Sequence, residues 1–364
     1  MIESISMNSK KKASPIGLRP RVFVGLSGGV DSAVSALLLK KAGYDVTGVF
    51  IKVWQPDFLT CTWREERREA MRVAGKLGIP FLFFDFEDEY KKGVAEYMIE
   101  EYRNGRTPNP DVMCNKEIKF GVFLKKAKEM GADFVATGHY ARVEKNKKGK
   151  FVFKEGVDKE KDQSYFLWML KQKDLASILF PVGNLKKEEV RELAKKFKLP
   201  NARKKDSQGI CFLGDVDLED FLSHFIKTDV GKVLDTEGKV IGRHRGALYY
   251  TIGERHGFEV EKKKPDSKAY FVVSKDIEKN TITVSNNDLE IESILPKSVT
   301  IEKENWINQS KTNSMEVRLR YRQEKVRVKV EGNVIHLEKP QLVASGQSIV
   351  FYQGEECLGG GIIL

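Results

Sequence analysis

Apolar and polar residues alternate with two different periods along the chain. Between Arg21 and Cys211, short β-branched or aromatic runs are separated by stretches in which apolar residues recur with helical spacing. The runs predict strands at 22–24, 46–53, 81–86 and 134–137, and the stretches predict helices at 33–42, 64–77, 116–130 and 188–198. Strands that alternate with helices indicate βαβ units, so we expect an α/β fold with a doubly wound parallel sheet.

The remainder of the chain has a different pattern. Residues 214–280 combine one predicted helix, at 218–226, with short strands that glycines interrupt. From Thr281, β-branched residues alternate with polar ones and the alternation turns back at 331–333, which predicts an antiparallel meander and a small β-barrel. We therefore expect a disordered tail at 1–20, an α/β domain at 21–212, a small mixed central domain at 213–280 and a C-terminal β-barrel at 281–364.

Composition restricts the class of protein. Hydrophobic residues at 41% and charged residues at 32% are typical of a globular protein. The 63 Lys and Arg exceed the 52 Asp and Glu by 11, which suits a polyanion such as RNA but does not require one. The chain has no apolar run near the ~20 residues of a membrane helix, so we expect no membrane partner and a cytoplasmic location. The four cysteines include no CxxC pair, so we predict no disulfide framework and no metal site.

A glycine-rich loop joins the first predicted strand to the first predicted helix. It consists of Gly25, Leu26, Ser27, Gly28, Gly29, Val30, Asp31 and Ser32. Glycines allow backbone amides to approach a phosphate, and a helix N-terminus favours an anion. The loop has neither the Lys-Ser/Thr end of a Walker A sequence nor GxGxxG spacing, and it resembles the SGGxDS signature of the PP-loop ATP pyrophosphatases. The alternative is a serine-capped glycine turn without a ligand.

The resemblance to PP-loop enzymes implies further parts of an ATP site. ATP, with Mg2+, is the expected substrate and is cleaved between its α- and β-phosphates. The adenine is expected near the end of the second strand, at Ile51, and a helix that opens after the fourth strand is expected to close over the ribose. Gly138 in that segment is expected to contact the nucleotide. His139 beside it is either catalytic or structural, since ligands bind at the carboxyl ends of strands in open α/β sheets.

Two cysteines lie in cationic surroundings. Residues 109–115 are predicted to be a loop because of their prolines, and Cys114 then lies near the start of the next helix, where a thiolate is favoured. Asp111 is close enough in sequence to exchange a proton with it. Cys211 follows a pair of lysines and a glycine turn. Either thiol could instead be a small buried hydrophobe.

Motifs along nearly the whole chain from Arg21 resemble those of the bacterial tRNA-specific 2-thiouridylases. Besides the glycine loop, the matching segments are 105–111, 114–120, 136–140, 161–167, 180–183, 206–212, 249–257, 320–323, 340, 346–347 and 357–362. The resemblance implies ATP-dependent thiolation of C2 of the wobble uridine, position 34, in tRNAs for Lys, Glu and Gln. The expected products are 2-thiouridine, AMP and pyrophosphate.

The resemblance also implies roles for individual residues. Cys211 is expected to carry a persulfide sulfur that a cysteine desulfurase or a sulfur relay protein supplies. Cys114 is expected to be the nucleophile that releases this sulfur by forming a transient disulfide with Cys211, and Asp111 is expected to be the acid/base residue. The residues expected to contact tRNA are Asn109, Pro110, Asp111, His139, Lys161, Asp162, Gln163, Arg320, Tyr321 and Gln347.

Some positions keep a second interpretation. Arg320 and Tyr321 are predicted to lie on an alternating strand, where the alternative is a solvated sheet surface. Ile51 stands where the family often has Met, and an aliphatic exchange beside an adenine should be tolerated. Cys61 has no expected role, and Cys357, in an acidic setting, is predicted to be structural. Competing functions for the whole chain are another PP-loop ligase and a non-catalytic tRNA-binding module.

Overall fold

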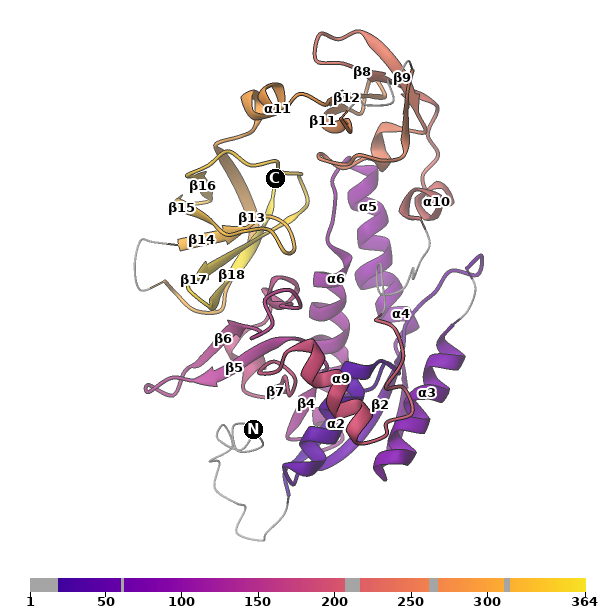
Figure 1. Ribbon diagram of the computed structural model, residues 1–364, viewed down its shortest axis with the longest axis vertical. Helices are drawn as coiled ribbons and strands as arrows, with labels where there is room; N and C mark the ends of the chain where they lie inside the picture. Colours follow the sequence, from indigo (N-terminus) through magenta and orange to yellow (C-terminus); the bar gives the residue numbers. More distant parts are fainter. Residues whose placement is uncertain (1–18, 60–61, 207–216, 262–267, 311–314) are drawn as a thin grey trace.

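The computed structural model describes residues 19–59, 62–206, 217–261, 268–310 and 315–364 (Figure 1). Its first part, the α/β part, is built around a sheet in the order β3-β2-β1-β4-β7. The strands are β1 (Arg21–Gly25), β2 (Asp45–Lys52), β3 (Phe81–Asp85), β4 (Phe134–Ala136) and β7 (Ile178–Leu179). All neighbouring pairs are parallel. The doubly wound parallel sheet is confirmed, and the strand order reverses between β1 and β4.

Helices cover both faces of this sheet. One face is covered by α2 (Val30–Lys41), α3 (Trp63–Leu77) and α9 (Lys187–Lys196). The other face is covered by two continuous helical segments, made of α4 (Glu87–Tyr90), η2 (Lys91–Glu96) and α5 (Tyr97–Arg103), and of α6 (Pro110–Met113), η3 (Cys114–Val122) and α7 (Phe123–Glu129). Val22 and Val24 pack toward the first face and Phe23 toward the second, because side chains alternate along a strand. Among the described helices, none is long and apolar enough to cross a membrane.

The segment that carries Cys114 differs from the prediction. The sequence predicts a loop at 109–115, but a helix begins at Pro110. Asn109 caps it, because its side-chain oxygen accepts a hydrogen bond from the Val112 amide at 3.3 Å. Proline is favoured in the first turn of a helix, where its missing N–H removes no hydrogen bond. The loop prediction is wrong because it treats proline only as a helix breaker.

Two other predicted elements are also corrected. Residues 137–140 form no helix after β4 and lead directly into β5 (Ala141–Lys145), which pairs with β6 (Phe151–Glu155). Gln163 keeps this segment extended, since it pairs with both the amide and the carbonyl of Tyr140. The alternating strand predicted to carry Arg320 and Tyr321 ends at Arg318, so these two residues lie in a turn. There the Leu319 amide bonds to the Gln323 side chain, at 3.1 Å, and not to a neighbouring strand.

The central part forms a second sheet, in the order β10-β9-β8-β12-β11. Its strands are β8 (Gly231–Leu234), β9 (Val240–His244), β10 (Phe258–Val260), β11 (Phe271–Asp276) and β12 (Thr281–Ser285), with the helices α10 (Leu218–Ser223) and η5 (Ala247–Tyr249). Because β12 pairs with both β8 and β11, this sheet extends past residue 280. Helix α11 (Asp288–Ile294) then leads toward the last part of the chain.

The C-terminal part is the expected antiparallel barrel. Its strand order is β13-β16-β15-β14-β17-β18, and β13 pairs with β18 to close it. The strands are β13 (Ser298–Trp306), β14 (Met315–Arg318), β15 (Val326–Glu331), β16 (Val334–Leu337), β17 (Ser348–Gln353) and β18 (Glu356–Ile363). Val317, Ile335 and Phe351 are fully buried in its interior. Figure 1 shows α5 and α6 rising from the parallel sheet into the space between the barrel and the central sheet.

Candidate active site

The glycine loop lies at the carboxyl end of β1, where the strand order reverses. The Ser32 hydroxyl accepts a hydrogen bond from the Ser27 amide at 3.3 Å and donates one to the Gly29 carbonyl at 3.1 Å. Gly28 has a φ of +74°, and a β-carbon there would lie 2.9 Å from the Glu66 carbonyl oxygen. Only glycine fits this position. Helix α2 begins at Val30, within the last residues of the loop, so its positive end faces the place where a phosphate would bind.

The other residues of the predicted ATP site lie along the same edge of the sheet. A β-carbon on Gly138, just after β4, would lie 2.7 Å from the Ser32 nitrogen and 2.8 Å from the Asp31 carbonyl carbon. Ile51 lies near the carboxyl end of β2, opposite Phe84 of β3. Strands β1, β2 and β4 thus bring the predicted residues to the edge where open α/β sheets bind ligands. Their contacts with ATP stay predictions.

A charged network beside the loop was missed by the sequence analysis. Lys187, at the start of α9, donates to both carboxylate oxygens of Asp31, at 2.7 and 2.8 Å, and its nitrogen lies 2.9 Å from an oxygen of Asp206. The Tyr140 hydroxyl also donates to Asp31, at 2.9 Å. Although partial burial alone would raise the pKa of Asp206, hydrogen bonds from Lys187 and Lys161 hold it at about 2. The network therefore places an ionised carboxylate and two lysines next to the loop.

Asn201 was missed as well. Its side-chain nitrogen donates to the carbonyls of Gly28 and Gly29, both at 2.9 Å. The residue is only 6% exposed, and its side-chain oxygen has no hydrogen-bond partner among the described residues. By engaging these two carbonyls, Asn201 keeps their negative ends away from an anion bound at the loop. A single asparagine outside any motif gives no signal in the sequence.

The helical segment at 110–129 carries the residues predicted for thiol chemistry. Asp111 lies partly buried in its first turn, and Cys114, three residues later, is 2% exposed. The helix has π-type geometry from Cys114 to Val122, and such geometry is frequent at functional sites. Cys211 and Cys61 lie outside the described residues, so the pairing of Cys114 with Cys211 stays a prediction. Cys357 is fully buried, and burial raises the pKa of its thiol.

His139 connects this helical segment to the nucleotide edge. The Lys119 nitrogen lies 3.4 Å from Nε2 of His139, and the Thr137 hydroxyl lies 2.7 Å from Nδ1. A lysine ammonium can only donate, so Nε2 accepts and Nδ1 carries the proton. Burial, and then the charge of Lys119, lower the pKa of His139 well below its ordinary value. The ring is therefore neutral near pH 7 and serves as a hydrogen-bonding group.

Residues expected to contact tRNA meet where the barrel joins the α/β part. The buried Tyr165 hydroxyl donates to two barrel carbonyls, at 3.2 and 2.9 Å, and it also faces the Asn109 side chain. Gln347 of the barrel donates to the carbonyls of residues 107 and 108, at 2.9 and 3.3 Å. We call this region the Tyr165 junction. Its hydrogen bonds hold the segment that precedes the helical turn of Asp111 and Cys114 against the barrel.

Arg320 and Tyr321 lie at the same junction. The Tyr321 ring centroid is 4.5 Å from that of Phe166, which adjoins Tyr165 in sequence. Arg320 donates to the Ile252 carbonyl of the central part at 2.7 Å, and burial lowers the pKa of its guanidinium. The turn that carries both residues therefore touches all three parts of the chain. Their contacts with tRNA stay predictions.

Lys161, Asp162 and Gln163 have three different environments. Lys161 joins the charged network beside the glycine loop. Asp162 is 2% exposed, and its carboxylate accepts hydrogen bonds from two backbone amides and, at 2.8 Å, from the Arg318 guanidinium. The Gln163 side-chain oxygen accepts from the Tyr140 amide at 3.0 Å. In this structure Asp162 is thus closed to solvent and links the α/β part to the barrel.

Comparisons with known proteins cover almost the whole chain. Family models described as "tRNA methyl transferase HUP domain", "tRNA methyl transferase PRC-barrel domain" and "Aminomethyltransferase beta-barrel domain" match residues 20–215, 219–286 and 296–363. A protein of Streptococcus thermophilus named "tRNA-specific 2-thiouridylase MnmA" is 46% identical over 95% of this chain and 95% of its own length. A protein of Streptococcus equi subsp. zooepidemicus with the same name is 45% identical with the same coverage.

The fold and the loop define a class of protein, the PP-loop ATP pyrophosphatases. The family follows from the identity of 45–46% over 95% of the chain. This chain belongs to the tRNA-specific 2-thiouridylase family. Among solved structures, the "U34-tRNA thiolase NcsA" of Methanococcus maripaludis is 18% identical with a TM-score of 0.36, over 61% of this chain and 70% of that chain. That likeness is too low to bear on the function.

Proposed function

We propose that this chain is an ATP-dependent tRNA-uridine 2-sulfurtransferase that converts the wobble uridine, position 34, to 2-thiouridine. The observation that carries the proposal is an intact PP-loop at the reversal point of the sheet, in a chain 45% identical to a named tRNA-specific 2-thiouridylase over 95% of its length. Gly28 and Gly138 keep the close backbone contacts that only glycine allows. An intact loop favours an active enzyme over a non-catalytic tRNA-binding module.

ATP would activate the uridine by turning its O2 into part of a leaving group. O2 attacks the α-phosphorus, the bond from that phosphorus to the bridging oxygen breaks, and pyrophosphate departs. The loop amides, the N-terminus of α2 and Lys187 would hold the phosphates. Mg2+ bound to the phosphates would neutralise part of their charge. Among the described residues there is no cluster of three or more His, Cys, Asp or Glu that could hold a metal ion.

Sulfur transfer would use Cys211, Cys114 and Asp111. The terminal sulfur of a Cys211 persulfide attacks C2 and expels AMP, which leaves C2 joined to Cys211 through two sulfur atoms. The Cys114 thiolate then attacks the Cys211 sulfur, forms the disulfide and releases 2-thiouridine, after which a thiol reductant restores both cysteines. The position of Cys114 supports this role, since it lies in the same helical segment as Asp111, three residues later. Asp111 lies on the same helical face and would move the proton.

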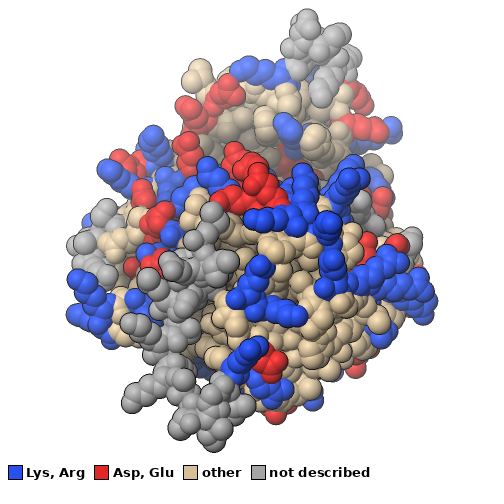
Figure 2. Space-filling model, turned by 60° about the horizontal axis from the view of Figure 1, so that its bottom comes forward, with Lys and Arg blue, Asp and Glu red and all other residues tan. Residues whose placement is uncertain are grey.

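The tRNA would approach at the Tyr165 junction. A base that undergoes chemistry must leave its stack, and Tyr321 beside Phe166 offers an aromatic surface for stacking. Gln347 and Asn109 would hold the segment that meets the target base. Lys and Arg side chains are spread over the face drawn in Figure 2, in keeping with a net charge of +11 and a polyanionic substrate. The buried Asp162 would act by holding its neighbours in place.

The finer assignments of substrate and partner rest on the family. We propose tRNAs for Lys, Glu and Gln as substrates, and a cysteine desulfurase or a sulfur relay protein as the sulfur donor. A persulfide sulfur has to be handed from one thiol to another, so the donor must reach Cys211 directly. The cytoplasm, where mature tRNA is used, is the proposed location.

A direct assay for 2-thiouridine tests the proposal. The full-length protein is incubated with ATP, a persulfide donor and unmodified tRNA, and the digested nucleosides are analysed by mass spectrometry. We expect 2-thiouridine only when ATP is present. Cys114→Ser and Cys211→Ser should each abolish it, because each removes a sulfur that the transfer needs. Cys61→Ser is the control and should keep activity, since no role is assigned to that thiol.

The outcomes separate the competing functions. Consumption of ATP with tRNA but without a sulfur product would point to another PP-loop ligase. Binding of tRNA with neither ATP cleavage nor a product would point to a non-catalytic module. Thiolation by Cys211→Ser with the same donor would show that Cys211 is not the sulfur carrier.

A further inference from the structure

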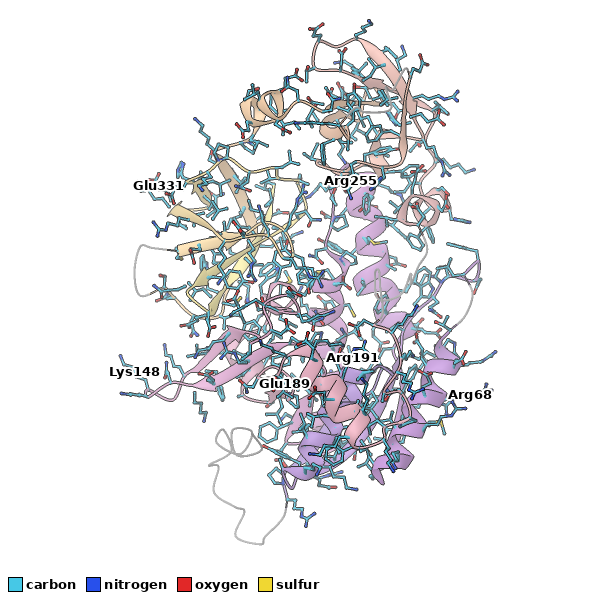
Figure 3. The ribbon with its side chains drawn as sticks, viewed as in Figure 1. Arg68, Lys148, Glu189, Arg191, Arg255 and Glu331 are labelled. Atoms are coloured by element: carbon cyan, nitrogen blue, oxygen red, sulfur yellow. The ribbon has the colours of Figure 1, made fainter. Side chains whose placement is uncertain are left out.

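Three cationic side chains converge on one carboxylate beside the glycine loop. Arg191 and Lys187 lie 2.5 and 2.9 Å from one oxygen of Asp206, and Lys161 lies 3.0 Å from the other. Lys187 also reaches Asp31, inside the loop, at 2.7 Å. The cations come from two separate segments, since Lys161 follows β6 while the other two lie on α9. Figure 3 shows the labelled Arg191 on α9, where this helix runs beside α2.

The three cations have few acceptors of their own. Their side chains contact only the carboxylates of Asp206 and Asp31 among the ion pairs of the described residues, while a third carboxylate, Asp158, bonds to the backbone amide of Lys187. The cluster is also accessible in part: the side chains of Lys161 and Arg191 are 32% and 30% exposed, whereas that of Lys187 is 10% exposed. An anion arriving from solvent could therefore reach two of the three cations without rearrangement of the sheet.

The attraction for an anion comes from the side chains and not from the start of α9. The Lys187 amide is already bonded to Asp158 at 2.9 Å, and the Lys186 amide is bonded to Glu189 at 2.7 Å. Two amides at the start of α9 are thus already bonded to carboxylates. The side chains of Lys161, Lys187 and Arg191 are therefore the groups that could bind an anion. Their present acceptor, the Asp206 carboxylate, could be displaced by an anion that binds them more strongly.

We propose that Lys161, Lys187 and Arg191 bind the pyrophosphate that leaves ATP, and that the Asp206 carboxylate occupies these three cations until the nucleotide arrives. The inference rests on the proposed function, because it assumes cleavage between the α- and β-phosphates. Pyrophosphate offers more oxygens and more negative charge than one carboxylate, so it satisfies three cationic donors better. Lys187 connects this site to the glycine loop, because its side chain donates a hydrogen bond to Asp31 of the loop.

Binding of the two products by the full-length protein tests this assignment. Affinities for inorganic pyrophosphate and for AMP are measured separately by titration calorimetry. We expect Arg191→Met and Lys161→Met each to weaken pyrophosphate binding about tenfold or more, the usual effect of losing a charge-assisted hydrogen bond, and to leave AMP binding unchanged. Lys196→Met is the matched control, because Lys196 is an exposed residue in the last turn of the same helix.

A fourth variant tests the part played by Asp206. Asp206→Asn removes the competing negative charge, so pyrophosphate should bind several-fold more tightly than to the wild type. The inference is overturned if the wild type does not bind pyrophosphate, if Arg191→Met and Lys161→Met bind it normally, or if they lose AMP in parallel. Formation of 2-thiouridine by the same wild-type preparation separates the two proposals. If it forms while pyrophosphate affinity is unaffected by the variants, only this inference fails.

Discussion

The glycine loop and the Tyr165 junction are assembled in opposite ways. The loop consists of consecutive residues, and its own serines hold it with help from one asparagine. The junction instead joins side chains from distant segments: Gln347 bonds to a carbonyl 240 positions earlier in the chain. The first site depends mainly on local backbone geometry, and the second depends on how the barrel sits against the α/β part.

The difference predicts separate consequences for substitutions. Changes at the loop should affect steps that involve ATP, because the loop residues all come from one strand–helix unit. Changes at the junction should affect tRNA use and stability, because the junction is also an interface between parts of the chain. A substitution that fails to follow this division would show that the two sites are coupled.

The largest effect is expected from Gly138→Ala. The new methyl group would lie 2.7 Å from the Ser32 nitrogen, so β4 and the loop would have to separate. Displacements near 1 Å at a reacting centre lower rates about 100-fold, and we expect a loss of at least that size in ATP-dependent thiolation. Gly75→Ala is the control, since a β-carbon there meets nothing within 4 Å. Activity of Gly138→Ala within a few-fold of the wild type would contradict the loop assignment.

The next largest effect should come from Arg318→Met at the barrel interface. Arg318 donates a hydrogen bond to the buried Asp162 carboxylate at 2.8 Å and forms an ion pair with the buried Glu155 carboxylate at 2.9 Å. Removing one partner of a buried ion pair destabilises by about 3–5 kcal/mol, and we expect a loss of that order in urea-induced unfolding. Arg243→Met breaks an exposed pair with Glu259 and should leave stability unchanged. Equal effects of the two variants would show that the interface is not held by Arg318.

A smaller effect is expected at the aromatic surface of the junction. Tyr321→Ala removes a ring that lies 4.5 Å from Phe166, and stacking of a base on such a ring contributes about 1–3 kcal/mol. We expect KM for tRNA to rise roughly tenfold, with KM for ATP unchanged, as measured by steady-state thiolation. Tyr321→Phe keeps the ring and should behave like the wild type. A parallel rise in KM for ATP would mean that the residue supports both sites.

The smallest effect concerns acid stability. The pKa of Asp206 in the folded chain, about 2, lies below the value of about 3.9 expected when unfolded. Its ionised form therefore stabilises the fold above pH ~4, and this contribution is lost as the pH falls toward about 2. We expect Asp206→Asn to be less stable than the wild type at pH 7 by about 1 kcal/mol, after allowance for solvent screening, and the difference to shrink by pH 3. Urea unfolding at both pH values measures it.

Much of the fold could be predicted because it depends on local patterns. The parallel sheet, the barrel and the glycine loop each follow from periodicity or from consecutive residues. The helix start at Pro110 was missed because proline can end a helix or begin one, and only the Asn109 cap decides between them. The end of β14 was missed because the alternation continues past Arg318, whereas the Gln323 side chain takes the next amide.

The parts of the candidate site that could not be predicted are contacts between residues that lie far apart in the sequence. Lys187 and Asp31 are 156 positions apart, and charged residues on a helix normally face solvent, so no pattern indicated their pairing. Asp162 was predicted from the family as a tRNA contact, yet nothing in its neighbours shows that Arg318 would bury it. Cys114 and Asp111 were identified from helix position and resemblance, and their roles stay predictions.

The central claim is that the loop activates the uridine and the cysteines deliver sulfur in a separate step. The most direct test is to incubate Cys211→Ser with tRNA and ATP labelled at the α-phosphate, and to follow the label on the tRNA by gel electrophoresis. The account predicts that labelled AMP accumulates on the tRNA while no 2-thiouridine forms. Label that never appears on the tRNA, together with thiolation by the wild type under the same conditions, would contradict it.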